Sequence, residues 1–416
     1  MKTALNLIAI RFTFLLSIAF ILCFNNGSFY FLDWINSYIT SAKDFAVNSL
    51  NNNLLHLNEV NPQFNGSGDT TYAYVLLLGT FLFAVIGTII WSVLDRKRKS
   101  HNHLLYWLIV TLRFYVGFML VHYGLAKLNN GQFPGPSATG MMTTYGDSSP
   151  MGLAWRFLGF SEGYKTFMFI AEMMGVLLFF RKTATIGAIL CLMTCVNIMA
   201  INYFFDVPVK LLSTSLVVMC LIILSPNLIR LFKLFFKGET IKLDLLQPPA
   251  FKAPWAKVGK EVVKYLAIAL CALVPAAHTV IAAVDKKSDA NQNLYGAYRI
   301  SAIDWPNGTP NADSTFLSHK WQLMVIDSRD RATIRFGEDE IIYCKTQIDN
   351  KNKTIKLSFN DEPGVRYTLS YRLPVPGVLE LRGELFGKVT KISLSKKEFN
   401  LTKQGFRWIN EYPDNK

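Results

Sequence analysis

The sequence predicts an α-helical integral membrane bundle of about seven transmembrane helices, followed by an all-β antiparallel barrel or sandwich domain. Three observations lead to this fold class. The 416 residues are 51% hydrophobic and only 17% charged, whereas a soluble protein carries about 25% charged residues. Long apolar stretches recur through residues 1–284. From about residue 319 onward the hydrophobic period becomes two, which is typical of β-strands.

The apolar stretches are candidate transmembrane helices. Such a helix needs about 20 mostly apolar residues to cross about 30 Å of hydrocarbon. The fourth candidate is short by this measure. The candidates are 5–24, 72–94, 104–125, 164–180, 183–205, 208–225 and 262–284.

Two short features define the ends of these candidates. The fifth and sixth are separated only by Asp206, Val207 and Pro208, which predicts a tight hairpin because proline suits the first turn of a helix and not its interior. Arg11 interrupts the first stretch, and no small-x-small cleavage site follows it. We therefore expect an uncleaved signal anchor rather than a cleaved signal peptide.

Basic residues gather in three clusters that flank the candidate helices. Arg96–Lys99 follows the second helix, Arg181 and Lys182 follow the fourth, and a third cluster lies within 230–264. An alternating chain brings all three to one side, which is cytoplasmic because cytoplasmic loops carry the excess of Lys and Arg. We expect a multi-pass protein of a bacterial inner membrane, with a cytoplasmic N-terminus and a periplasmic C-terminal domain. The net charge of +14 then points to the lipid bilayer rather than to nucleic acid.

The remaining segments divide the chain. Residues 29–50 have a helical i, i+3, i+4 rhythm, which predicts an amphipathic helix on the outer membrane face, and 230–261 begins as a basic apolar helix. We expect four parts: an N-terminal two-span region, a four-helix membrane core, a basic linker with the seventh span, and a β-rich domain. Their boundaries are 1–104, 105–230, 231–285 and 286–416.

The β-rich domain contains seven runs that alternate apolar with polar residues and are separated by turn-forming residues. It has no Gly-rich phosphate loop, no metal-spaced Cys and His set and no nucleophile elbow, so we expect a binding or packing module. Five of the six cysteines lie in apolar runs, which excludes a disulfide framework. The runs lie near 321–326, 333–336, 341–344, 354–359, 367–371, 378–382 and 389–394.

Two charged residues lie inside the candidate helices, where a charge at the bilayer centre costs at least about 2.5–3.5 kcal/mol. Arg113 lies nine residues into the third helix, about 14 Å from its cytoplasmic end. Glu172 lies eight residues before the end of the antiparallel fourth helix, about 12 Å from the same face. These depths predict a buried pair between Arg113 and Glu172, which either lines a polar chamber or only clamps the helices together.

A second polar layer is predicted near the outer face. All of its members lie within about two helical turns of the predicted boundary, so we expect them to converge on one pocket beneath the loop 126–160. The alternative is that the lysines reach headgroups, Asp206 caps the hairpin, and His122 is a packing residue rather than a proton carrier. The layer consists of His122, Lys127, Asn202, Asp206 and Lys210.

Small residues indicate which faces are packed. Gly117 and Gly124 share the face of Arg113 on the third helix, and glycines let helix backbones approach closely in lipid. We expect this face to point into the bundle. Cys191 and Cys195 are one turn apart, but no charged neighbour in sequence would activate them, so we interpret them as packing residues rather than as a redox pair.

Residues 105–230 resemble the DoxX-like family of four-helix membrane proteins. The resemblance depends on Arg113-x-x-x-Gly117, on Gly124-Leu-Ala-Lys127-Leu128, on Phe133-Pro-Gly-Pro136 and on Ala171-Glu172-Met-Met-Gly175. It covers less than one third of the chain. It implies a four-helix core and links to quinone-coupled oxidation of thiosulfate or to redox assembly, while distant relatives act as cargo receptors or chaperones. The sequence departs from a thiol-based role because it has no outward Cys-x-x-Cys.

Two functions are therefore open, and whether the protein is an enzyme is open with them. The first is a membrane oxidoreductase that passes electrons from a small periplasmic sulfur-type donor to a bound quinone. Its predicted catalytic residues are His122, Glu172 and Arg113, and its predicted binding residues are Lys127, Asn202, Asp206 and Lys210. The second is a scaffold, chaperone or accessory subunit whose β-domain binds a periplasmic or membrane protein partner. We expect no metal site in either case.

Overall fold

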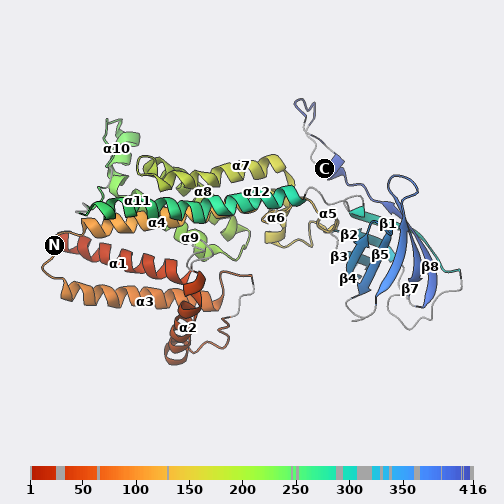
Figure 1. Ribbon diagram of the computed structural model, residues 1–416, viewed down its shortest axis with the longest axis horizontal. Helices are drawn as coiled ribbons and strands as arrows, with labels where there is room; N and C mark the ends of the chain where they lie inside the picture. The colour runs from red at the N-terminus through yellow and green to blue at the C-terminus, as the bar shows by residue number, and fades with distance from the viewer. Residues whose placement is uncertain are drawn as a thin grey trace. The chain divides into compact units, whose positions relative to one another are not determined.

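The structure is a computed structural model in which two compact units are distinguished. One unit consists of Met1–Pro134 and Ser149–Val284, and the other of Gly135–Ser148 and Asp285–Lys416. The first is helical and the second is built on a β-barrel (Figure 1). The structure describes residues 2–24, 33–62, 66–128, 131–244, 247–249, 253–286, 294–306, 321–327, 331–336, 340–359, 366–385, 387–403, 405 and 407–412.

The helical unit confirms a multi-pass membrane bundle. Among the described residues, six helical stretches are long and apolar enough to span a bilayer. They lie in α1, α3, α4, α8, α9 with α10, and α11 with α12. The elements of this unit are α1 (Lys2–Cys23), α2 (Asp33–Leu50), the π-turn η2 (Asn51–Leu55), α3 (Thr71–Leu94), α4 (Asn102–Leu128), α6 (Pro150–Phe160), α7 (Glu162–Met173), the 3₁₀ segment η3 (Met174–Phe179), α8 (Ala184–Phe204), α9 (Lys210–Leu224), η4 (Ser225–Asn227), α10 (Leu228–Lys237), α11 (Pro254–Ile268), η5 (Ala269–Leu273) and α12 (Val274–Lys286).

The predicted fourth span at 164–180 is not among these six, so the described residues contain six long apolar helices where seven were predicted. The α-helix α7 ends at Met173, and the chain continues as the 3₁₀ segment η3. The 12 residues of α7 span about 18 Å as α-helix, and the six 3₁₀ residues of η3 add about 12 Å. The apolar composition of this stretch was identified correctly, but the change of helix type was not.

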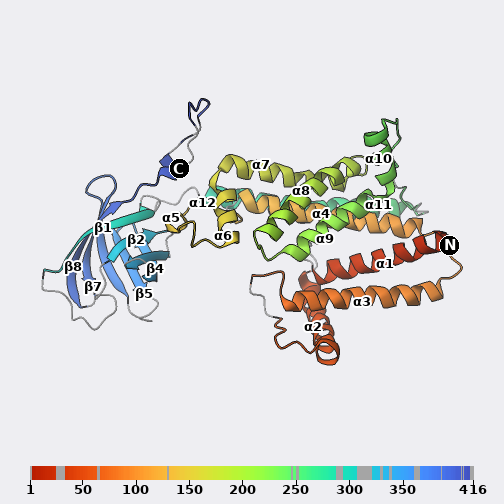
Figure 2. The same cartoon turned by 180° about the vertical axis from the view of Figure 1, so that it is seen from behind.

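Helix α4 lies at the centre of the helical unit. It packs against α1, α7, η3 and α9, and Figure 2 shows α8 and α9 beside it from behind. Its large side chains Tyr115, Phe118 and Leu112 are almost completely buried. Burial on all sides explains why the apolar residues of α4 surround the whole helix instead of forming one stripe.

Two glycines set how closely α4 approaches its neighbour, as the sequence predicted. A Cβ atom on Gly117 would lie 2.5 Å from Phe179 Cε1 and 3.0 Å from the carbonyl oxygen of Gly175. A Cβ on Gly124 would lie 3.4 Å from Glu172 Cβ. The glycine face of α4 therefore points into the bundle, against α7 and η3.

The predicted helices outside the spans are present. Helix α2 begins at Asp33, and residues 29–32 of the predicted segment lie outside the described residues. Helix α10 is the predicted basic apolar helix, and it ends where Gly238 takes a left-handed conformation with φ of 65°. Glycine adopts this conformation without the steric cost of a Cβ atom.

The second unit contains a closed antiparallel barrel in which each strand pairs with the next and β8 pairs with β1. The barrel interior is filled by side chains such as Met324, Ile355 and Leu381. This confirms the predicted all-β domain. The strands are β1 (Gly296–Asp304), β2 (Trp321–Ile326), β3 (Arg331–Phe336), β4 (Glu340–Asp349), β5 (Thr354–Phe359), β6 (Tyr367–Arg372), β7 (Val378–Leu385) and β8 (Lys388–Lys396), followed by the short helix α14 (Asn400–Lys403).

Strand β1 was not among the seven runs predicted from alternation. Tyr298, Ile300 and Ile303 pack with the barrel interior. The register of β1 shifts between Ile300 and Ala302, which lies between the second and third of these inward positions. The inward positions are therefore two and then three residues apart. A β-bulge of this kind breaks the period of two on which the sequence prediction depends.

The segment 135–148 belongs to the barrel unit although it lies between two membrane-unit segments in sequence. Its helix α5 (Ala138–Met142) lies beside β1 and β2 (Figure 1). Ala138 packs with Leu323 and Val325 on the outer face of β2. The Thr139 backbone N–H donates to Asp327 Oδ1 at 3.2 Å, and the Thr139 hydroxyl donates to Asp327 Oδ2. Strand β2 is consequently covered on both faces.

Candidate functional site

The strongest polar feature of the helical unit is a buried ion pair between the ends of α4 and α7. Lys127 Nζ lies 2.7 Å from Glu172 Oε1 and 2.6 Å from Oε2. Each residue is only 4% exposed. Lys127 Nζ also donates to Gln132 Oε1 at 3.0 Å and lies 5.4 Å from the centre of the Phe133 ring. The charges are thus paired and hydrogen-bonded, as buried charges require.

The chain after α4 turns back onto the lysine. The backbone N–H groups of Gly131 and Gln132 both donate to the carbonyl oxygen of Ala126, at 3.0 and 3.1 Å. A cation in the last turn of a helix is favoured by the helix dipole. This reversal brings the Gln132 amide beside Lys127 and places the buried Phe133 ring 4.8 Å from Trp155 of α6.

The ion pair lies in the wall of a cavity of about 460 Å³. The walls come from α4, α6, α7, α8 and α9 and are mostly apolar and aromatic. A few polar groups in an apolar cavity of this size are typical of small-molecule sites. The charged, amide and hydroxyl side chains of the lining are Lys127, Gln132, Glu172, Thr194, Asn197, Asn202 and Ser213.

The hairpin between α8 and α9 closes one side of the cavity. The side chain of buried Asn202 donates from Nδ2 to the Val209 carbonyl oxygen at 3.4 Å. The backbone carbonyl oxygen of Asn202 accepts from the Val207 N–H at 2.9 Å. The left-handed conformation of Asp206, with φ of 51°, completes the tight turn that the sequence predicted. The carboxylate of Asp69 accepts from the first N–H groups of α9, at Lys210 and Leu211.

The predicted pair between Arg113 and Glu172 is wrong. Arg113 is buried, as expected, but its Nε donates to the carbonyl oxygen of Leu178 at 2.8 Å, while Glu172 binds Lys127. The six steps from Glu172 to Leu178 lie mostly in 3₁₀ conformation, which rises about 2.0 Å per residue. They advance about 12 Å, so the carboxylate lies nearer to Lys127 at the far end of α4.

The predicted outer layer is only partly brought together. Lys127 and Asn202 line the cavity, whereas His122, Asp206 and Lys210 are not among the described residues of its lining. Asp206 is largely exposed and forms a local ion pair with Lys210 at 2.7 Å, which agrees with the alternative that it stabilises the hairpin. The His122 ring lies 6.1 Å from that of Tyr123. A role of His122 as a proton carrier stays a prediction.

Sequence reasoning missed the residues that the connection between α4 and α7 contributes. Gln132 and Trp155 line the cavity but lie in the connection 126–163, Gln132 in the turn after α4 and Trp155 in helix α6, for which the sequence predicted no helix. Asp69 was also missed, because its contact with α9 joins positions 141 residues apart. The Phe133-Pro-Gly-Pro136 motif was the one signal that this connection is structured.

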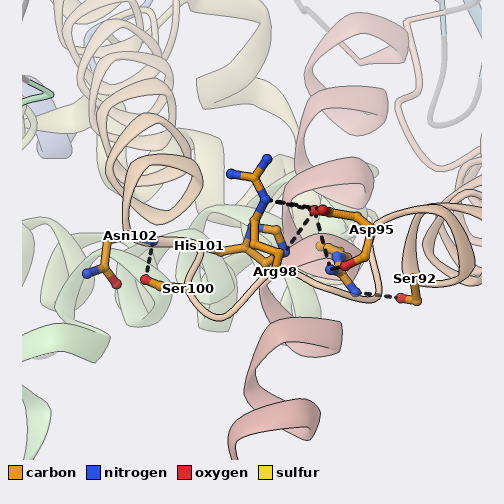
Figure 3. Close-up of polar contacts among 7 residues, drawn as sticks. Ser92, Asp95, Arg98, Ser100, His101 and Asn102 are labelled. Carbon is orange, nitrogen blue, oxygen red and sulfur yellow. Dashed lines mark hydrogen bonds and ion pairs between the residues drawn. The ribbon is translucent and has the colours of Figure 1, made fainter.

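A separate polar cluster fixes α1 to the loop between α3 and α4 (Figure 3). Arg11, which is 4% exposed, donates to Ser92 Oγ at 2.9 Å and to the Asp95 carbonyl oxygen at 3.1 Å. His101 Nε2 lies 4.0 Å from Asp95 Oδ2, and Arg98 Nε lies 3.0 Å from the same oxygen. Among the described residues, the buried Nε of Arg11 and Nε2 of His101 have no hydrogen-bond partner. This cluster accounts for an arginine within the first apolar stretch.

Comparison with known proteins identifies one relative. No family model matches the chain, and no solved structure matches it. The uncharacterized protein YwoB of Bacillus subtilis (strain 168) is 41% identical over 132 residues, which are 32% of this chain and 83% of YwoB. Because the match covers most of that relative at this identity, the chain belongs to the same family as YwoB.

Proposed function

We propose that the helical unit binds a lipid-soluble molecule with a small polar head, of the quinone class, in the cavity beside Lys127 and Glu172. The observation that carries the proposal is a buried ion pair in the wall of an otherwise apolar cavity. A charged pair buried between the helices of a membrane protein is costly and is commonly functional. The DoxX-like resemblance supports the same ligand class.

The cavity fits such a molecule in size and chemistry. Its volume of about 460 Å³ lies within the range of about 300–1,000 Å³ that small-molecule sites occupy. Trp155 and Phe133 offer flat apolar surfaces to a ring. The amides of Gln132 and Asn202 offer hydrogen bonds to carbonyl oxygens of a head group, which has only acceptors when it is oxidised.

The residues of the cavity would have distinct roles. Gln132 would donate hydrogen bonds from its amide nitrogen and orient the head group, Lys127 would hold Glu172 in place through the contacts it already makes, and Glu172 would hold a proton or release it to the ligand. A bound quinone would supply an acceptor for two electrons and two protons. A small anionic sulfur compound, such as sulfite or thiosulfate, is the proposed electron donor. In this proposal the membrane is a bacterial inner membrane and the barrel is periplasmic.

The test is quinone reduction by the purified full chain in detergent, with a short-chain quinone and either sulfite or thiosulfate. We expect turnover that is lost in Glu172→Gln and in the double variant Lys127→Met with Glu172→Met. Lys210→Gln is the control, because Lys210 lies outside the cavity lining and pairs locally with Asp206. No turnover in the unaltered protein, or equal loss in Lys210→Gln, would remove the proposal. His122→Ala tests the predicted proton carrier in the same assay.

A second candidate function is that of a scaffold or accessory subunit whose barrel binds a protein partner. The observation that favours it is the filled barrel interior, which leaves the outer surface as the place for binding. Ile341 and Tyr343 on the outer face of β4 are 47% and 57% exposed. Crosslinking in cells with a photoreactive residue at Tyr343 should capture one defined protein, and labelling of lipid or of nothing would count against this function.

A further inference from the structure

A second, smaller cavity of the helical unit is lined by two arginines. It has a volume of about 40 Å³ and shares no lining residue with the larger cavity. Its walls come from α4, the start of α8, and the segment around η4. A single water needs about 10–15 Å³ by the same measure, so the space suits a group of a few heavy atoms and not a ring system. The residues used below are Arg113, Arg181, Tyr106, Thr185, Asn227 and Asp244.

Arg113 has binding capacity left in this cavity. It is 6% exposed, and within the described part of the chain its hydrogen bond runs from Nε to the Leu178 carbonyl oxygen. A guanidinium carries five N–H donors in a fixed plane. Its two terminal nitrogens are therefore left for another acceptor, at a position where an unmatched cation is costly.

The other lining groups favour an anion. Arg181 adds a second positive charge, and buried Tyr106 adds a hydroxyl group. The one carboxylate of the lining, Asp244, lies 3.4 Å from Arg230 and is thus matched by its own cation. The lining thus contains two arginines and one carboxylate.

The part of the wall around Asn227 is held in place. Asn227 is buried, accepts from the Asp244 N–H at 2.8 Å and donates to the Asp244 carbonyl oxygen at 3.1 Å. Its Nδ2 also lies 3.4 Å from Thr185 Oγ1. These bonds fasten the chain after α10 to the ends of α8 and α9, so the cavity is built by fixed segments.

We infer that this cavity binds a phosphate group. Planar guanidinium groups form paired hydrogen bonds with phosphate oxygens, which makes arginine the preferred residue for such sites. Two arginines, a hydroxyl and a space of a few heavy atoms match one phosphate. The group can belong to the head of an anionic lipid or to free inorganic phosphate, and the chemistry at the arginines is the same.

The test is binding of two probes to the delipidated full chain in detergent. The probes are inorganic phosphate, compared with chloride at equal ionic strength, and dihexanoyl phosphatidic acid, compared with dihexanoyl glycerol. Binding of the lipid alone assigns the site to a headgroup, and binding of inorganic phosphate assigns it to the free ion. Either result supports the inference, and binding of neither probe would overturn it.

Variants link the binding to the cavity. We expect Arg181→Gln and Arg113→Lys to weaken the dissociation constant at least about tenfold, because a charge-assisted pair of hydrogen bonds is lost or altered. Lys182→Gln is the matched control, since Lys182 is the exposed neighbour of Arg181. Equal weakening by Lys182→Gln would show a nonspecific charge effect and would contradict the site. Arg181 is only partly buried, so its replacement still tests the site if Arg113→Lys does not fold.

Discussion

Lys127 and Glu172 are 45 residues apart in sequence, yet Lys127 Nζ contacts both carboxylate oxygens of Glu172 at 2.6 and 2.7 Å inside the helical unit. The pair joins the last turn of α4 to the last turn of α7. It is also the most polar part of the wall of the larger cavity. The same contact therefore serves the packing of two helices and the chemistry of the proposed site.

Breaking this pair on one side should be strongly destabilising. Glu172→Gln strands the buried Lys127 charge, at an expected cost of about 3–5 kcal/mol. The double variant Lys127→Met with Glu172→Met removes both charges and should recover most of that loss, because apolar replacements of a buried pair are often neutral. Thermal unfolding of the purified protein measures both. A double variant as unstable as Glu172→Gln would contradict this account of the pair.

The close approach of α4 and η3 should not tolerate a side chain at Gly117. Gly117→Ala places a Cβ atom 2.5 Å from Phe179 Cε1 and 3.0 Å from the Gly175 carbonyl oxygen, and overpacking of this kind costs about 1–3 kcal/mol. The matched control is Gly259→Ala in helix α11, where nothing lies within 4 Å. We expect a lower melting temperature for Gly117→Ala only. Equal melting temperatures for the two variants would rule out the close packing.

The cluster of Figure 3 predicts a pH dependence of stability. Burial, and then the charge of Arg11, lower the pKa of His101 below its ordinary value of 6.5. The unfolded chain therefore binds a proton more readily than the folded protein. The contribution of neutral His101 to the free energy of unfolding is therefore present above about pH 6.5 and is lost as the pH falls below that value.

The measurement is the melting temperature of the protein and of His101→Gln between about pH 8 and about pH 5. The unaltered protein should lose stability more steeply toward low pH than the variant, because glutamine binds no proton. The Asp95 carboxyl does not contribute in this pH range. Burial raises its pKa, but the nearby charges of Arg98 and Arg11 together lower it below its ordinary value of 3.8. Parallel curves for the two proteins would mean that His101 is not buried in its neutral form.

The docking of α5 on β2 should depend on Asp327. Asp327→Ala removes the acceptor of both the backbone N–H and the hydroxyl of Thr139, which loosens α5 by about 1–3 kcal/mol. Limited proteolysis should then cut within 135–148 several times faster. Glu384→Gln on the exposed side of β7 is the control and should leave the cutting rate unchanged. An unchanged rate in Asp327→Ala would show that these bonds do not hold α5.

Much of the fold could be predicted from composition and period. Apolar length located the spans, and alternation located β2 to β8, because both depend on local residue order. Trp321–Ile326 is nearly continuously apolar, and this pattern reflects burial on both faces by the barrel interior and by α5. The bulge in β1 and the 3₁₀ segment η3 were missed because both change the repeat on which the prediction rests.

The site was less predictable than the fold. The sequence indicated that Glu172 and Arg113 needed partners, since each would otherwise be a costly buried charge, whereas it placed Lys127 in a polar layer near the outer face. Choosing the partners required the register of α4 against α7, and the estimate of depth assumed one helical rise throughout. Arg113 consequently has the Leu178 carbonyl oxygen as its partner. Gln132 and Trp155 come from the turn after α4 and from the short helix α6, neither of which was predicted from the sequence.

The central claim is that the cavity beside Lys127 and Glu172 holds a quinone-type head group, and photolabelling with a short-chain azidoquinone tests it most directly. The account predicts labelling of cavity residues such as Trp155, Met168 and Met193. It also predicts that unlabelled quinone competes and that the double variant Lys127→Met with Glu172→Met is not labelled there. Labelling confined to outward residues such as Phe204, which is 82% exposed, without competition, would contradict it.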